Sequence, residues 1–385
     1  MSVKKICCLL FTCTIFINSI AQTDSCNLQI SLLTCSPGAE LYSTFGHSAL
    51  RVKDSTGMDI IFNYGTFDFN DPDFYAKFVR GKLNYFVSVE YFNDFLAAYQ
   101  YEQRGIIEQT LQLTCAQKKQ LFDALKTNAK EENKFYKYDF LYDNCSSRLR
   151  DMIAKHATPG ITFKNILPNS GTTPRNLIHG YLHAGHQPWS KLGIDILLGA
   201  KLDAPLTNQQ AMFLPDYLLK GFDSAIYKNE TVITSKQLVL PATAIVNTGN
   251  NNTPFIYLGI LFLIIAVASF VPALKKLLHI FDYILFAITG LLGVLLLFMW
   301  WGTNHVLCSN NLNLLWALPT HLLLVFYLRS KKQWVNYYWL AVVIINGLLL
   351  MLWNWLPQQL NTALIPVVAL LLLRSFMNFK NNRVK

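Results

Sequence analysis

A histidine and a distant cysteine are the residues of this sequence best suited to chemistry. His47 stands in the run Phe45–Val52, which has β-strand character, and Cys145 follows Asp143 and Asn144 at the expected start of a helix. A thiol is a good nucleophile only as the thiolate, and helix N-termini and nearby imidazoles commonly lower its pKa. The pair therefore predicts cysteine acyl chemistry, with Cys145 as nucleophile and His47 as base.

The histidine requires a β-hairpin to position it. Two strand-like segments flank the turn at Asp54–Gly57, and we expect Lys53 to pair with Asp59 across it. In that register His47 and Asn63 project from the same face, because side chains alternate along a strand. Asn63 would then hydrogen-bond the imidazole and fix its tautomer, as the third member of a catalytic arrangement.

The cysteine requires a capped helix. Asp143 and Asn144 are both good N-cap residues, which places the Cys145 sulfur in the first turn, where the helix dipole favours negative charge. An alternative is that the cysteine is half of a disulfide or a small core residue, and that His47 is simply packed. The cysteine count argues against a disulfide, because removal of the N-terminal segment leaves an odd number: Cys26, Cys35, Cys115, Cys145 and Cys308. Pairs among the other four cannot be assigned from the sequence.

Composition indicates a membrane protein with an exported part. Of 385 residues 52% are hydrophobic and 15% charged, and the apolar residues concentrate after residue 255. At the N-terminus, Lys4 and Lys5 precede the apolar run Ile6–Ile17 and a small-residue site at Ala21, which predicts a signal peptide over residues 1–21. The alternative is an uncleaved anchor, although the run is shorter than a bilayer requires.

The C-terminal third predicts a topology of about five membrane spans over residues 256–376. The candidate spans are Ile256–Leu274, Ile280–Trp301, Leu312–Leu328, Tyr337–Leu356 and Leu360–Phe376. Clusters of Lys and Arg alternate with nearly uncharged loops between them. By the positive-inside rule, the clusters Lys275–Lys276, Arg329–Lys332, and Arg374 with Lys380–Lys385 are cytoplasmic, and the loops Gly302–Asn311 and Pro357–Gln359 lie outside.

The sequence predicts an α+β fold for the exported domain, residues 22–245. Strands are expected at Ile30–Leu33, Ser48–Lys53, Ile60–Tyr64 and Lys82–Val89, and helices at Asp71–Arg80, Tyr91–Tyr101, Ala116–Ala129 and Cys145–His156. The stretch Thr158–Gln187 is expected to be loop-rich because of its prolines and glycines, and residues 246–255 form a linker to the first span.

Charge and histidine content point to no further ligand class. The net charge of +10 comes partly from the membrane-flanking clusters, so we expect no nucleic-acid partner. His179, His183 and His186 lack a cysteine or carboxylate at ligand spacing and are interpreted as exposed loop residues. No metal and no cofactor is expected.

Four motifs together resemble a known family. Ser31–Gly38, Phe45–Val52, Phe62–Phe69 and Asp143–Ser146 are similar to the Lnb-type periplasmic domain of Bacteroidota, a family that includes lipoprotein N-acyltransferases. More distantly, the order of a histidine strand and then an Asn-Cys helix resembles circularly permuted NlpC/P60 enzymes and lecithin:retinol acyltransferase. The resemblance extends to the membrane part through Thr303–His305 and Asn311–Trp316, and it implies a permuted papain-like fold for the exported domain.

The resemblance implies acyl transfer at the outer face of the cytoplasmic membrane. Cys145 would take an acyl chain from a phospholipid as a thioester, and the N-terminal amine of a diacylated lipoprotein would receive it, with His47 moving protons. Further candidates for substrate binding are Arg51, Tyr64, Asn144, His305 and Asn313, of which His305 and Asn313 lie in or near the first outer loop.

Two other functions remain open at this point. A membrane-tethered peptidase or amidase of the NlpC/P60 type would use Cys145 and His47 on peptidoglycan with water as acceptor. A non-catalytic scaffold would carry an incidental thiol. Several membrane spans favour a bilayer-resident substrate over peptidoglycan, because a murein amidase needs only one anchor.

Overall fold

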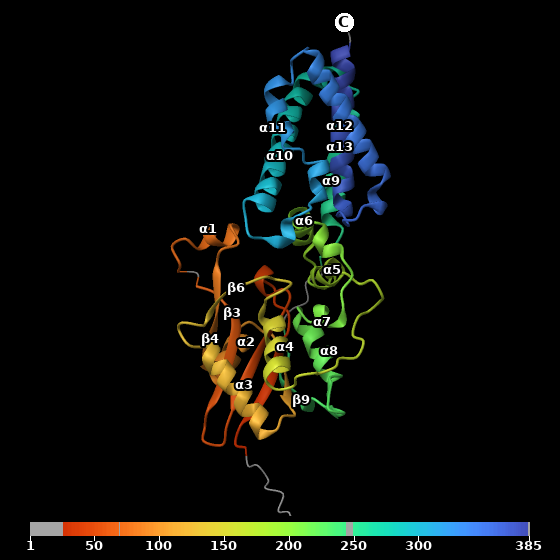
Figure 1. Ribbon diagram of the computed structural model, residues 1–385. Coiled ribbons are helices and arrows are strands. Elements are labelled where there is room, and N and C mark those ends of the chain that lie inside the picture. Colours follow the sequence, from red (N-terminus) through yellow and green to blue (C-terminus); the bar gives the residue numbers. More distant parts are fainter. Residues whose placement is uncertain (1–25, 69, 244–248, 384–385) are drawn as a thin grey trace, which may run out of the picture.

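A sheet domain lies against one end of a bundle of apolar helices (Figure 1). The computed structural model describes residues 26–68, 70–243 and 249–383. The predicted signal peptide lies outside the described residues, as do residues 246–248 of the predicted linker.

The N-terminal domain is built on an antiparallel sheet. Within the described residues it has seven strands in the order β6-β4-β3-β2-β1-β5-β9. Their bounds are β1 Gln29–Cys35, β2 His47–Lys53, β3 Asp59–Thr66, β4 Asn84–Tyr91, β5 Ile106–Leu111, β6 Phe135–Lys137 and β9 Ile233–Leu240; β7 Ile226–Tyr227 and β8 Glu230–Thr231 form a separate hairpin. The four predicted strands correspond to β1–β4, and the predicted pairing of Lys53 with Asp59 is confirmed.

Helices cover both faces of this sheet. Their bounds are α1 Phe74–Val79, α2 Phe92–Tyr101, α3 Cys115–Asn128, α4 Cys145–His156, α5 Pro174–Ala184, α6 Pro188–Leu197, α7 Asn208–Ala211 and α8 Pro215–Asp223. Helix α2 packs on one face, where Phe92 and Phe95 meet Leu33 and Ile61. Helices α3, α4 and α8 pack on the other face, and Leu50 and Phe62 belong to the core there. An α+β domain is therefore observed.

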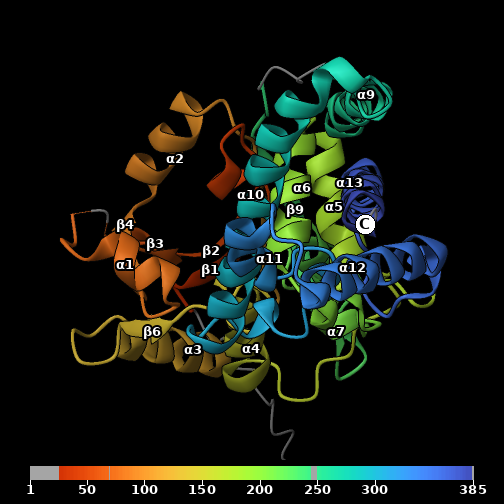
Figure 2. The same cartoon turned by 90° about the horizontal axis from the view of Figure 1, so that it is seen from above.

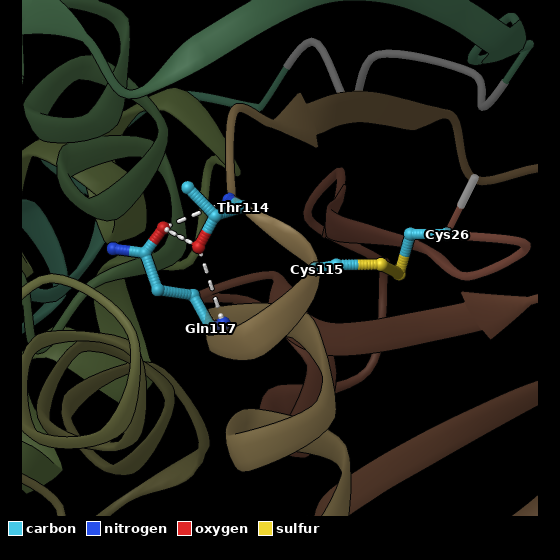
Figure 3. The surroundings of a disulfide bond; sticks show 4 residues. All are labelled: Cys26, Thr114, Cys115 and Gln117. Carbon is cyan, nitrogen blue, oxygen red and sulfur yellow. Dashed lines mark hydrogen bonds between the residues drawn. A yellow bond between two sulfur atoms is a disulfide. The ribbon is translucent and has the colours of Figure 1, made fainter. Parts of the chain in front are cut away.

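A disulfide and a capping box secure the start of α3. Cys26, just before β1, is bonded to Cys115, the first residue of that helix (Figure 3). Beside the bond, the hydroxyl of Thr114 accepts from the Gln117 backbone, and the Gln117 side chain accepts from the Thr114 backbone N–H at 2.8 Å. The remaining cysteines of the described residues, Cys35, Cys145 and Cys308, are free thiols.

The expectation of loop structure over Thr158–Gln187 is wrong for its second half. Helix α5 starts where Thr173 caps the helix and Pro174 takes the first helical position, which suits proline because the N–H that it lacks has no helical partner there. His179 lies on this helix and is not an exposed loop residue. Its Nε2 lies 2.8 Å from a carboxylate oxygen of the buried Asp195.

The C-terminal part is a helical membrane domain. Its helices are α9 Thr253–Ala268, α10 Lys275–Trp301, α11 Thr320–Leu324, α12 Gln333–Met351 and α13 Ile365–Arg383. Among the described residues, three segments are long and apolar enough to cross a bilayer, namely those of α10, α12 and α13, and α9 is a shorter apolar helix. The predicted span Leu312–Leu328 is not one continuous helix: it comprises a 3-10 turn, the short α11 and a second 3-10 turn.

Buried hydrogen bonds join the two domains. Side-chain amides from the loops of the membrane domain bind the C-terminal part of α6: Asn313 donates to the Asp195 carbonyl at 2.9 Å, and Asn311 donates to that of Ile196 at 2.8 Å. Asn361, between α12 and α13, donates to the Asp195 carboxylate at 2.8 Å. The C-terminal end of α13 lies at the far end of the bundle from the sheet (Figure 1). Seen from above, the membrane helices lie over one side of the sheet domain (Figure 2).

Candidate active site

The start of α4 is held by a buried cap. Asn144 accepts a hydrogen bond from the Ser147 N–H at 2.9 Å, and the Ser147 hydroxyl accepts one from the Asn144 N–H at 2.8 Å. The side-chain amide of Asn144 also donates to the carbonyls of Phe140 and Phe213, at 2.8 and 2.7 Å. Of the two predicted N-cap candidates, Asp143 and Asn144, the structure has Asn144 as the N-cap. These bonds fix the helix position that carries Cys145.

Helix α4 lies beside the first residues of β2. The hydroxyls of Ser146 and Ser48 are 3.0 Å apart in the buried interface. Cys145 is 8% exposed, and the backbone N–H of Ser48 hydrogen-bonds its sulfur. The thiol of Cys145 therefore lies next to His47, the first residue of the strand.

The imidazole lies between the thiol and two polar side chains. Nε2 of His47 is 2.5 Å from Oδ1 of Asn63, and the Asn63 amide donates to a carboxylate oxygen of Glu90 at 3.1 Å. Because an amide oxygen only accepts, Nε2 carries the proton and Nδ1 remains for the hydrogen bond with Cys145. The structure thus brings together the three predicted residues in the order thiol, imidazole, amide.

Electrostatics favour an ion pair between the thiol and the imidazole. Burial of the Cys145 thiol disfavours the thiolate, but the charge and hydrogen bond of His47 outweigh burial and lower the thiol pKa below its ordinary value. Burial likewise opposes the charged imidazole, yet the Cys145 charge and the bonds to Cys145 and Asn63 raise the pKa of His47. Thiolate and imidazolium therefore stabilise each other.

Three residues near the pair, Gly65, Tyr138 and Glu90, were not among the predicted site residues. Gly65 has a left-handed φ of +91°, and an added Cβ there would lie 3.7 Å from the Cβ of Cys145 and 3.7 Å from the ring of Tyr138. A side chain at residue 65 would thus enter the space between them. Glu90 orients Asn63. The aromatic run before Asp139 is a weak sequence signal for Tyr138, but the proximity of Glu90 follows only from the β3–β4 register.

Arg51 and Tyr64, two of the predicted substrate-binding residues, bind other side chains of the protein. Arg51 forms ion pairs with Asp59 at 2.6 Å and Glu108 at 3.1 Å, and its guanidinium lies 3.4 Å from the centre of the Phe92 ring. Tyr64 is buried in the core, where its hydroxyl accepts from Asn128 at 2.9 Å. The third candidate in this domain, Asn144, is occupied as the cap of α4.

The two candidates from the outer loop lie at the interface between the domains. Nε2 of His305 is 2.9 Å from the carbonyl oxygen of Phe78, at the end of the sheet domain that faces the bundle. Asn313 is fully buried, and its amide holds α6 while its oxygen accepts from Trp316 at 2.9 Å. Asn313 therefore joins the domains, whereas His305 lines a cavity between them.

Two family models match this chain, one for each domain. The Lnb N-terminal periplasmic domain matches residues 16–180, and the Lnb transmembrane domain matches residues 247–384. Neither the curated proteins nor the solved structures contain a significant match. The N-terminal match includes His47, Asn63 and Cys145, and the C-terminal match includes the helices α9–α13.

Proposed function

The chain belongs to the Lnb-type family, and on that premise we propose that it is a cysteine-dependent acyltransferase that moves a fatty acyl chain from a phospholipid to the N-terminal amine of a diacylated lipoprotein. The single observation that supports this most strongly is the buried pair of Cys145 and His47, oriented by Asn63. Such a pair forms a covalent acyl-enzyme, and the attached membrane domain favours substrates that stay in the bilayer.

Two half-reactions follow from this geometry. In the first, the Cys145 thiolate attacks the ester carbonyl of the phospholipid, the ester C–O bond breaks, and the His47 imidazolium protonates the departing lysophospholipid oxygen. In the second, the lipoprotein amine attacks the thioester, His47 accepts the proton that the amine loses, and the thiolate leaves. A positioned acid or base such as His47 raises the rate of steps of this kind by about 10²–10⁴-fold.

The proposal extends to fold and topology. The pairing of a helix-start cysteine with a strand histidine bound to an asparagine through Nε2 supports a permuted papain-like fold. We place the signal peptide at residues 1–21, the periplasmic domain at 22–245, the linker at 246–255 and five spans within 256–376. The N-terminal domain would face the periplasm and the tail 377–385 the cytoplasm, as a multi-pass protein of the inner membrane.

Trapping of the intermediate tests the proposal. Purified full-length protein incubated with phospholipid alone should gain the mass of one fatty acyl chain on Cys145, and hydroxylamine should remove it. A diacylated lipopeptide with a free amine should then be converted to a triacylated product, whereas its N-acetylated counterpart should not. Cleavage of muropeptides without any fatty-acyl adduct would instead support a peptidoglycan amidase, and an inactive thiol would support a scaffold.

A further inference from the structure

A cavity of about 320 Å³ lies between the sheet domain and the first outer loop of the membrane domain. Its walls are mainly aromatic and aliphatic. Phe78, Leu83 and Tyr138 contribute from the sheet domain, and Val306 and Leu307 from the loop after α10. The volume lies at the lower end of the range of small-molecule pockets, which is about 300–1,000 Å³.

Two residues of the cavity wall lie near the catalytic pair, although neither His47 nor Cys145 lines the cavity itself. Phe45, two residues before His47, lines it. Tyr138 lines it as well. A Cβ added to Gly65 would lie 3.7 Å from the Tyr138 ring and 3.7 Å from the Cβ of Cys145, so the ring and this Cβ are at most twice that distance apart. Tyr138, in the cavity wall, and Cys145 are therefore neighbours.

Another part of the cavity wall comes from residues 304–308, shortly after the end of α10. The Asn304 N–H donates to the Arg80 carbonyl at 3.0 Å, which joins the outer loop to the segment after α1. Trp301, the last residue of α10, is 73% exposed, and Tyr75 on α1 is 80% exposed. Exposed aromatic side chains at the end of an apolar helix are typical of the headgroup region of a bilayer.

The ionisable groups of the walls are bonded within the protein or uncharged. The Asp139 carboxylate accepts the backbone N–H groups of Leu141 and Tyr142, both at 2.9 Å, and the His305 ring bonds the Phe78 carbonyl. Burial raises the pKa of the Cys308 thiol to about 11, which keeps it uncharged. The described residues that line this cavity include no lysine or arginine to balance an anionic ligand, whereas a methylene chain would bury apolar surface against them.

We infer that this cavity is the binding site for the acyl chain of the substrate, with the carbonyl end at Cys145 and the methylene chain between the sheet domain and residues 304–308 of the membrane domain. The inference rests on the proposed function for the reaction at the thiol. It assigns a substrate contact to the loop after α10, so that both domains contribute residues to the active site.

Photo-crosslinking tests this site apart from catalysis. Full-length protein carrying Cys145→Ala, which cannot form a thioester, is placed in nanodiscs with a phospholipid that bears a diazirine on its acyl chain. Crosslinks are expected on peptides covering residues 78–85, 138–140 and 304–308. Labelling confined to the lipid-facing sides of α9, α10 and α12 would overturn the inference, while the proposed function would still stand or fall on the thioester itself.

A matched pair of variants adds a steric test. Val306 lines the cavity and is 45% exposed, whereas Val79 on α1 is 44% exposed and does not line it. In the Cys145→Ala protein, Val306→Trp should reduce the crosslinks on residues 138–140 several-fold, and Val79→Trp should leave them unchanged. In the protein with Cys145 intact, Val306→Trp should slow thioester formation more for long-chain than for short-chain donors. Equal effects of the two substitutions would contradict the site.

Discussion

At the scale of single residues, the interaction of Cys145 with His47 explains how a buried thiol can be reactive. Burial alone keeps a thiol protonated, and Cys35 shows this, since burial raises its pKa to about 12. Cys145 differs because the imidazole charge and the Ser48 N–H oppose the same effect. The charge and hydrogen bond of His47, which lower the pKa of Cys145, therefore distinguish this thiol from Cys35, although Cys35 is the cross-strand partner of His47.

Substitutions along this chain of contacts should have graded effects. His47→Ala removes the acid–base group and should slow thioester formation by about 10²–10⁴-fold. Asn63→Ala removes the bond to the imidazole and should slow thioester formation less than His47→Ala does. Glu90→Gln acts only through Asn63 and should slow it least. Single-turnover rates by intact mass measure these losses. Losses at Glu90 as large as those at His47 would assign the carboxylate a direct part in the chemistry.

The pH profile of thioester formation should show the ion pair. The reactive form needs an ionised Cys145 and a protonated His47, so the rate rises through the lowered thiol pKa and falls through the raised imidazole pKa. The Asn63 bond raises the His47 pKa, so Asn63→Ala should move the alkaline limb to lower pH. If Asn63→Ala slows the reaction without moving the alkaline limb of the pH profile, Asn63 has only a structural role.

At the scale of elements, strands and helices with clear patterns were predictable, whereas β5, which carries a buried carboxylate and a buried amide, was not. Strands β1–β4 and the helices α2–α4 lie within a few residues of their predicted positions. Strand β5 was missed because Glu108 and Gln109 are fully buried in it, paired with Arg51 and with groups on α8, so its sequence lacks an apolar alternation. The contact of Glu90 with Asn63 depends on strand register, which single-strand patterns do not specify.

Two capping boxes allow a matched test of the element that carries the nucleophile. Asn144 is buried and binds two further carbonyls, whereas Thr114 caps α3 at the surface. Thr114→Ala should cost about 1 kcal/mol, as a typical lost cap does, with activity retained. Asn144→Ala should cost more, because each buried carbonyl left unpaired adds about 1–3 kcal/mol, and should also reduce thioester formation. Thermal unfolding of the full-length protein measures the difference; equal shifts would contradict it.

At the scale of the whole molecule, the outer loops of the membrane domain are part of the architecture of the periplasmic domain. Asn311, Asn313 and Asn361 bind α6 with buried amides, and residues 304–308 close one side of the cavity near Cys145. The sequence resemblance pointed to two of these loop segments, but it could not show that Asn313 contacts α6 and not substrate, because that contact joins distant parts of the chain.

The topology is testable by reporter fusions. A reporter active only outside the cytoplasm should work after Asn250, within Gly302–Asn311 or after Gln359, and should fail after Lys276 or Lys332, because Lys and Arg clusters stay on the cytoplasmic side. An exported reporter after Lys385 would mean that one of the five proposed spans does not cross. The segment around Pro319, which forms only short helical turns, would then be the first to reconsider.

The central claim, acyl transfer by Cys145, is tested most directly by intact-mass analysis of lipoprotein N-termini in cells that lack this protein and are complemented with either the unaltered chain or Cys145→Ala. We predict that the unaltered chain restores a third acyl chain, bound to the N-terminal amine. The Cys145→Ala chain, inserted in the membrane to the same level, should leave the lipoproteins diacylated with a free amine. Triacylated lipoproteins in the Cys145→Ala cells would contradict the account.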